Sequence, residues 1–195
     1  MANLTDYTYF YGEIKIPNLN STDKISSLNV DISVYEKEIL TDLIGYELYK
    51  DFVENQTDQR WVDFIEGKEF EFEFNGKTLI RKWNGLTNTI KLSLLSDYTY
   101  YKLKEQEATI SAEIGEVIPN GENSLRANST DKMVNAWLRM RELYGITPYG
   151  FNKLNEAHYI HYNDLPTAYN FLLANIETYE NWEFEPKNSV NVFDY

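Results

Sequence analysis

Apolar residues recur at helical spacing over the first third of the chain. Within residues 31–55 they fall three to five positions apart, which gives a helix one apolar face. Gly45 interrupts that spacing, so this stretch predicts either a helical hairpin that turns at Gly45 or a single kinked helix. A third, short helix is expected over about 58–66, where Trp61 and Phe64 share a face.

The spacing then changes from helical to alternating. Residues 69–74 alternate glutamate with phenylalanine, which places three aromatic rings on one face of a strand. Asn75-Gly76 follows, and this dipeptide is a strong hairpin signal because both residues of a tight turn need positive φ. We therefore expect a β-hairpin over about 69–81, inserted in an otherwise helical chain.

Helical spacing returns in the second half of the chain. Helices are expected over about 88–104 and 128–145, and a last one is expected to be capped by Asp164, with Pro166 in its first turn and an apolar face that extends to Tyr179. The pattern thus predicts a mainly α protein: a bundle of five or six helices with an inserted β-hairpin and extended arms.

Three irregular segments are too apolar for free tails or loops: an N-terminal arm over 1–28, a long interaction loop over 105–128 and a C-terminal arm over 182–195. The N-terminal arm is expected to dock on its own domain or on a neighbouring molecule, and the loop either contacts a neighbour or folds back over its own bundle. The candidate interaction residues in these segments are Tyr9, Phe10, Ile110, Ile114, Val117, Ile118, Val192 and Phe193.

Length and charge narrow the possible functions. A chain of 195 residues favours a single domain over 1–195. A formal charge of −13 opposes binding to phosphate backbones, so the chain is not expected to grip DNA. An acidic channel lining through which DNA slides is compatible with that charge, although a solvated acidic surface is the simpler interpretation. No segment has the apolar length of a membrane span or the pattern of a secretory signal, so we expect a cytoplasmic protein without membrane contact.

Residues able to carry chemistry are sparse. There is no cysteine, no glycine-rich phosphate loop and no nucleophile motif. His158 and His161 lie three positions apart, with Asp164 three further on, and would share a face on a helix. Pro166 argues against that helix, so ordinary surface histidines are the simpler explanation. We expect no catalytic residue, no metal site and no cofactor, and hence no enzyme.

Several segments, taken in order, resemble a known group of proteins. They are Tyr35–Tyr49 (YEKEILTDLIGYELY), Gln59–Gly67 (QRWVDFIEG), Arg81–Leu86 (RKWNGL), a helix with Tyr98, Tyr100 and Tyr101, Ile114–Val117 (IGEV) and Ser129–Val134 (STDKMV). This series, which covers about residues 1–145, resembles head–tail connector (adaptor or ring) proteins of tailed phages and prophages of Bacteroidetes, including the crAss-like phages. No single motif carries the resemblance; the shared order does.

The resemblance implies a helical virion protein at the head–tail junction, assembled in the host bacterial cytoplasm. It implies a ring of identical subunits, usually dodecameric, that contacts the portal protein and neighbouring connector or tail proteins. DNA would pass through such a ring without specific binding. The hairpin at residues 69–81 departs from the pattern, and the resemblance gives it no role.

Two other classes of function remain open from the residues alone. One is a monomeric peptide- or carbohydrate-binding module that uses exposed tyrosine and tryptophan. The other is a metal-dependent enzyme that uses His158 and His161. The assembly state of the purified protein separates the connector hypothesis from both.

Overall fold

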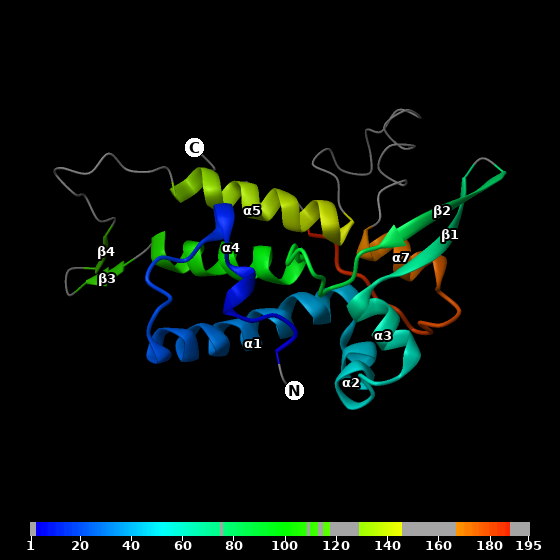
Figure 1. Cartoon of the computed structure of the whole chain (residues 1–195), viewed down its shortest axis with the longest axis horizontal. Coiled ribbons are helices and arrows are strands. Elements are labelled where there is room, and N and C mark those ends of the chain that lie inside the picture. Colours follow the sequence, from blue (N-terminus) through cyan, green and yellow to red (C-terminus); the bar gives the residue numbers. More distant parts are fainter. Residues whose placement is uncertain are drawn as a thin grey trace.

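A computed structural model describes residues 3–74, 76–108, 110–112, 115–117, 129–145 and 167–187. These residues form a mainly helical protein with a small inserted β-hairpin, as the sequence predicts (Figure 1). The helices are α1 (Thr22–Ile44), α2 (Tyr46–Glu54), α3 (Gln59–Glu66), α4 (Leu94–Ala108), α5 (Ser129–Tyr144) and α7 (Ala168–Ala174), with 3-10 turns η1 (Tyr7–Tyr9) and η2 (Gly12–Ile14). The strands are β1 (Lys68–Phe74), β2 (Lys77–Trp83), β3 (Ile110–Ala112) and β4 (Gly115–Val117).

The three longest helices form the body of the molecule. In Figure 1, α4 runs between α1 and α5, and it packs against both. Leu40 and Leu43 of α1, Leu95 of α4 and Met140 of α5 are buried in one continuous core. No helix among the described segments combines the length and apolarity that crossing a membrane would need.

The first helix is longer than the spacing predicts. It begins at Thr22, because the Ser21 side chain accepts a hydrogen bond from the Lys24 N–H and caps it. It ends at Ile44, and Gly45, with φ of +81°, separates it from α2. The chain therefore breaks at Gly45 into two separate helices. The alternative of a single kinked helix is wrong.

The inserted hairpin has the predicted turn. Lys77 lies opposite Phe74, which leaves Asn75 and Gly76 as the two-residue connection, and Gly76 has φ of +70°. Gly67 and Gly85 let the base of this hairpin approach the end of α3 closely. A Cβ on Gly67 would lie 2.3 Å from the Trp83 carbonyl oxygen, so only glycine permits this approach.

An aromatic cluster fixes the hairpin base to the helices. The rings of Phe64, Trp83 and Phe171 contact one another, with each pair of centroids 6.2 or 6.3 Å apart. Phe70 of β1 meets Phe171 edge-on at 5.7 Å. The Trp83 indole N–H donates to the Phe64 carbonyl oxygen at 2.8 Å. The buried indole N–H is thus satisfied, and the proximal half of the hairpin belongs to the core.

Two further helices have boundaries that differ from the prediction. The helix expected over 88–104 begins at Leu94, because the Asn88 side chain closes a turn by bonding both the N–H and the carbonyl oxygen of Leu92. The last helix begins behind Thr167, whose side chain caps it, and not at Asp164. The helix ends at Ala174. Its apolar face was expected to extend to Tyr179, and it does not. Asp164 and Pro166 lie outside the described residues.

Candidate interaction surfaces

The N-terminal arm docks on its own domain. Tyr9 and Phe10 are only 9% and 5% exposed, and together with Ile14 they form a second core cluster with Ile32 of α1 and Tyr100 of α4. The structure thus places two predicted interaction residues against their own helices. That they also contact a neighbouring subunit stays a prediction, since the exposed aromatic rings of the arm are Tyr7 and Tyr11.

A buried carboxylate fixes the start of this arm. Glu36 of α1 is 1% exposed and accepts hydrogen bonds from the Leu4 N–H at 2.9 Å, the Thr5 N–H at 2.8 Å and the Thr5 hydroxyl at 2.6 Å. Burial raises the pKa of Glu36, and the three donors oppose that rise. The arrangement satisfies every donor that it buries, which suits a structural anchor for the arm.

A second ionic contact fixes the arm further along. Arg139 of α5 bonds Asp97 of α4 at 2.7 Å and Glu13 of the arm at 2.6 Å. Burial raises the pKa of Asp97 while the guanidinium opposes that rise, and the same hydrogen bond raises the pKa of Arg139. One side chain thereby joins two helices and the arm, and both charges have partners.

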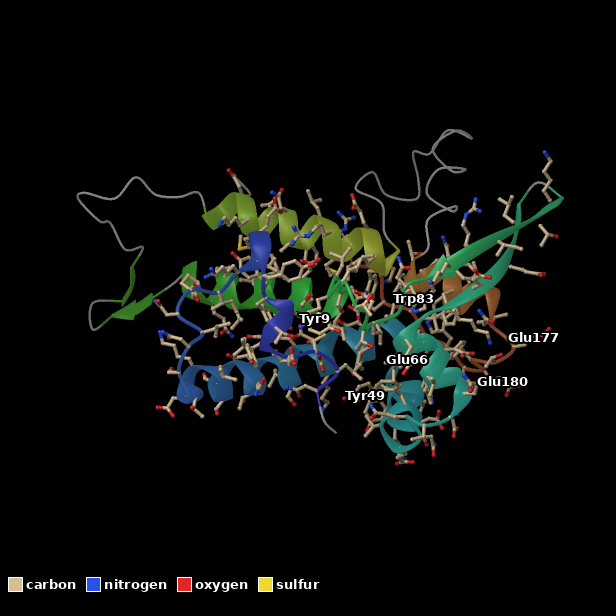
Figure 2. The ribbon with its side chains drawn as sticks, viewed as in Figure 1. Tyr9, Tyr49, Glu66, Trp83, Glu177 and Glu180 are labelled. Atoms are coloured by element: carbon tan, nitrogen blue, oxygen red, sulfur yellow. The ribbon has the colours of Figure 1, made fainter. Side chains whose placement is uncertain are left out.

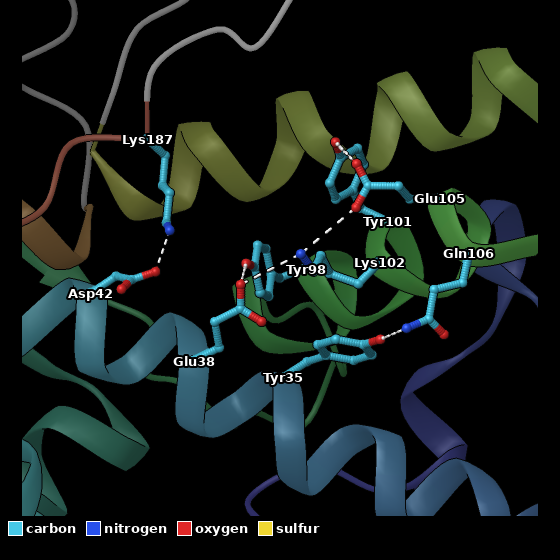
Figure 3. A network of polar contacts seen from close by, with 9 residues as sticks. All are labelled: Tyr35, Glu38, Asp42, Tyr98, Tyr101, Lys102, Glu105, Gln106 and Lys187. Atoms are coloured by element: carbon cyan, nitrogen blue, oxygen red, sulfur yellow. Dashed lines mark hydrogen bonds and ion pairs between the residues drawn. The ribbon is translucent and has the colours of Figure 1, made fainter. Parts of the chain in front are cut away.

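A network of tyrosines and carboxylates links α1 to α4 (Figure 3). The Tyr98 hydroxyl donates to Glu38 at 2.7 Å, and the Tyr101 hydroxyl donates to Glu105 at 3.0 Å. Lys102 lies 3.5 Å from Glu38 and 3.7 Å from Glu105. Burial, more than the neighbouring carboxylates, raises the pKa of Tyr101 to about 12, and it also raises the pKa of Tyr98. Both phenols act as hydrogen-bond donors. Tyr98 joins α4 to α1, whereas Tyr101 and Glu105 pair within α4.

The C-terminal segment is fastened to the same helices. Lys187 forms an ion pair with Asp42 of α1 (Figure 3), and the Glu185 N–H donates to the Asp42 carbonyl oxygen at 2.8 Å. The Trp182 indole N–H donates to the Leu43 carbonyl oxygen at 2.8 Å. The first part of the predicted C-terminal arm thus docks on its own bundle. The candidate residues Val192 and Phe193 lie outside the described part.

The distal half of the β1–β2 hairpin projects from the body (Figure 1). A Cβ on Gly76 at its turn would have no neighbour within 4 Å, and Ile80 is 64% exposed. Lys77 of β2, next to the turn, is also exposed. The described residues of this half add little to the core, so they are free to serve contacts outside the chain.

Negative charge is concentrated in α2, α3 and the turns after α7. Residues 46–66 and 175–186 hold ten carboxylates and only Lys50 and Arg60 in return, a formal charge of −8 out of −13. The two stretches pack together: the Tyr179 ring lies 5.4 Å from that of Trp61, and its hydroxyl donates to the Arg60 carbonyl oxygen at 2.8 Å. Figure 2 shows Glu177 and Glu180 at the edge of the molecule beside α3. We call these two stretches the acidic lobe.

The predicted long loop is shorter than expected at its start. Helix α4 continues to Ala108, and β3 then pairs with β4 so that Ile110 lies opposite Val117. Two of the candidate residues are therefore partners in a short hairpin at the far end of α4 (Figure 1). Ile114 and Ile118 lie outside the described residues.

The described residues hold no cluster of three or more side chains suited to a metal ion, and His158 and His161 lie outside them. A surface depression of about 600 Å³ lies between the arm and the hairpin base, lined by Tyr9, Glu66, Lys82, Asn84, Asn88 and Ile90, among others. Its aromatic member, Tyr9, is buried, and Trp83 below it is 1% exposed. The depression therefore offers amides and charges but no open ring on which a sugar could stack.

No protein-family model, curated protein or solved structure matches this chain.

Proposed function

We propose that this chain is a virion structural protein, a ring-forming head–tail connector or adaptor subunit that links the portal to the tail and surrounds the DNA conduit. The proposal is carried by the contrast between a tightly cross-linked helical body and a hairpin that projects from it. Buried carboxylates and tyrosines hold the arm and the C-terminal segment to the helices, whereas the hairpin extends beyond them. A rigid body with a projecting contact element suits a subunit that must pack against copies of itself.

Charge and chemistry support the same function. The acidic lobe repels phosphate, so a ring of such subunits lets DNA pass without retaining it. The α1–α4 network joins helices rather than forming a reactive site, since Glu38 of α1 accepts from Tyr98 and pairs with Lys102 of α4. The order of segments resembles that of connector proteins, and this resemblance is the reason for placing the subunit between portal and tail.

A binding module is the weaker candidate because its tryptophan side chains are covered. Trp61, Trp83 and Trp137 are buried, and the Trp182 indole is engaged with the Leu43 carbonyl oxygen. The described aromatic rings that are exposed are tyrosines, Tyr7 and Tyr11 on the arm and Tyr46 on α2, so stacking would have to rely on these.

The decisive experiment is deletion of the gene from the phage or prophage that carries it. A connector subunit is required to join heads to tails, so electron microscopy of the mutant lysate should show DNA-filled heads and separate tails. Supplying the gene in trans should restore whole particles. Mass spectrometry of wild-type virions should find the chain in several copies per particle. Normal particles from the deletion mutant, or virions without the chain, would refute the connector function.

A further inference from the structure

The chain carries two small sheets that each stop at two strands. Among the described residues, β1 pairs only with β2, and β3 pairs only with β4. The base of the β1–β2 hairpin is supported by α7, but its distal half projects, and β3–β4 has no extensive contact with any other described element. A two-stranded sheet in water is marginally stable unless a further strand or a helix covers it. Both sheets would therefore be stabilised by accepting another strand.

The outer edge of β2 is open to such a strand. In a hairpin with a two-residue connection, the flanking pair Phe74–Lys77 exchanges both main-chain hydrogen bonds, and bonded and non-bonded pairs then alternate along the strands. The main-chain groups of Thr78 and Ile80 consequently point away from β1. In the part of the chain described, the one partner that these groups find is the Arg81 guanidinium, which donates to the Ile80 carbonyl oxygen at 2.9 Å. The edge thus offers main-chain donors and acceptors to another chain.

The composition of the strands narrows the choice of partner. β2 carries Lys77, Arg81 and Lys82 and no carboxylate, and cations on an edge strand oppose pairing with an identical strand. β1 packs against α7. β3 and β4 contain no cation, and their single charged residue is Glu116. Of the strands described, β3 and β4 are therefore the ones that are neither repelled by β2 nor already packed on the body.

The two sheets lie at opposite ends of the molecule. Figure 1 shows β1–β2 at one end of the longest axis and β3–β4 at the other, beyond the end of α4. They therefore cannot meet within one copy. A contact between them joins unlike surfaces of identical copies and leaves one of each free on every pair. Such a contact repeats from copy to copy and closes into a ring where the rotation permits.

We infer that the β3–β4 hairpin of one copy adds to the outer edge of β2 in a second copy, so that the two small sheets become one four-stranded sheet across the boundary between copies. The choice of a second copy rests on the proposed ring function and on the separation of the two sheets within one chain. Main-chain hydrogen bonds supply the contact, and the side chains on the two faces of the sheet set which strand is accepted.

The test blocks each edge separately in the full chain. Ile80→Pro removes an outward N–H from β2, while the bonds to β1 remain. Ser111→Pro with Glu116→Pro blocks the outward edges of β3 and β4, since these two residues face each other next to the bonded pair that flanks the turn. Wild-type protein should self-associate in sedimentation equilibrium, and each variant should associate at least about tenfold more weakly because main-chain bonds are lost.

Mixing the two variants distinguishes this contact from any other. The Ile80→Pro chain keeps its β3–β4 edges, and the double variant keeps its β2 edge. An equimolar mixture should therefore form a pair with one copy of each variant and nothing larger, because the pair uses the only intact edge on each partner.

Two controls keep the test specific. Ile80→Thr changes the same side chain but keeps the N–H and a strand-forming residue, so it should lose much less association than Ile80→Pro. Hydrogen exchange of the Leu79 and Arg81 amides, which bond β1, reports whether the hairpin survives the proline. If it does not survive, Thr78→Pro blocks the same edge one non-bonded pair nearer the turn.

Three results would overturn the inference: wild-type protein that stays monomeric up to about 1 mM, an edge variant with an intact hairpin that associates normally, or a mixture that stays monomeric or grows beyond the pair. Failure of this contact is separable from failure of the proposed function. Deletion mutants that leave heads and tails unjoined, rescued by genes carrying either edge variant, would preserve the connector and refute this contact. Normal particles from the deletion mutant, with a mixture that stops at the pair, would do the opposite.

Discussion

The N-terminal arm and the β1–β2 hairpin both leave the helical bundle, and the sequence makes both of them rich in aromatic residues. The arm returns to the body: Tyr9 and Phe10 are buried, and Glu36 fixes its start. Among the hairpin residues whose side chains are described, those buried are Phe70 and Trp83 at its base, and a Cβ on Gly76 would meet nothing within 4 Å. Aromatic content therefore does not decide whether a segment covers the core or reaches outward.

Polar partners separate the two segments. Arm residues bond a buried carboxylate on α1 and a guanidinium on α5, which Asp97 of α4 also holds. The exposed lysines of β2 have no partner among the described residues. A segment whose charges are satisfied within the chain is set for stability, whereas one with unsatisfied charge and exposed apolar area is set for a contact with another molecule.

The largest expected effect compares one side chain from each segment. Phe10→Ala should lower the free energy of unfolding by about 3 kcal/mol, because it removes a buried ring and leaves a cavity between the arm and α1. Ile80→Ala should change it by less than about 1 kcal/mol, because that side chain lies in solvent. Urea unfolding followed by circular dichroism measures both. Equal losses for the two variants would erase the distinction between arm and hairpin.

The sequence predicted the hairpin, but for the arm it left open whether it docks on its own domain or on a neighbour, and the reason is physical. The hairpin depends on alternation and on Asn75-Gly76, which are local signals. The arm depends on Glu36, whose donors in Leu4 and Thr5 lie more than thirty residues away along the chain. Local spacing carries no record of such a pairing.

The same reason explains the boundary errors. The start of α1 at Thr22 depends on a single capping side chain, Ser21, and on Leu28 and Ile32, which are buried by the arm rather than by the main core. The delayed start of α4 depends on the Asn88 side chain, which competes with helix formation by bonding the backbone of Leu92. For the candidate interaction residues, the sequence showed that they are apolar but not whether each is buried in its own domain or exposed to a partner.

The second prediction concerns the anchor of the arm. Glu36→Gln should lower the free energy of unfolding by about 1–3 kcal/mol, because the amide N–H₂ would face the donors of Leu4 or Thr5. Glu47→Gln is the matched control, and it should have no measurable effect because Glu47 is exposed. Thermal and urea unfolding compare the two, and a silent Glu36→Gln would show that the arm is held by apolar contacts alone.

The pH dependence of that anchor has a definite sign. Burial raises the pKa of Glu36, so the folded protein binds a proton at this carboxyl more tightly than the unfolded chain does. Its contribution to stability is fully present below the ordinary pKa of glutamate, about 4.3, and is lost as pH rises through the raised pKa. The unfolding free energy of wild type minus that of Glu36→Gln should therefore fall as pH rises above about 4. A difference that grows with pH would contradict the raised pKa.

The third prediction tests the turn of the hairpin. Gly76→Val should destabilise the hairpin by about 1–2 kcal/mol, because a β-branched residue resists the φ of +70° found there. Space is not limiting at this site, so the cost is conformational. Gly76→Asn is the control, since asparagine tolerates positive φ better than other non-glycine residues, and it should cost less. Hydrogen exchange of the β1 and β2 amides reports the effect, and equal protection in the two variants would count against this turn.

The smallest expected effect on stability comes from the second short hairpin. Replacing Ser111–Asn123 with a short Gly/Ser bridge removes β3 pairing with β4, and these strands lie at the far end of α4 (Figure 1). Because the core is formed by α1, α4 and α5, the change in unfolding free energy should stay within about 0.5 kcal/mol. If this segment contacts a neighbouring subunit or the portal, as Ile110 and Val117 suggest, the shortened chain should fold by circular dichroism but fail to enter connector complexes or virions. Unfolding of the shortened chain would instead make the segment a cover for Met133 or Trp137, and normal assembly would mean that the contact between copies lies elsewhere.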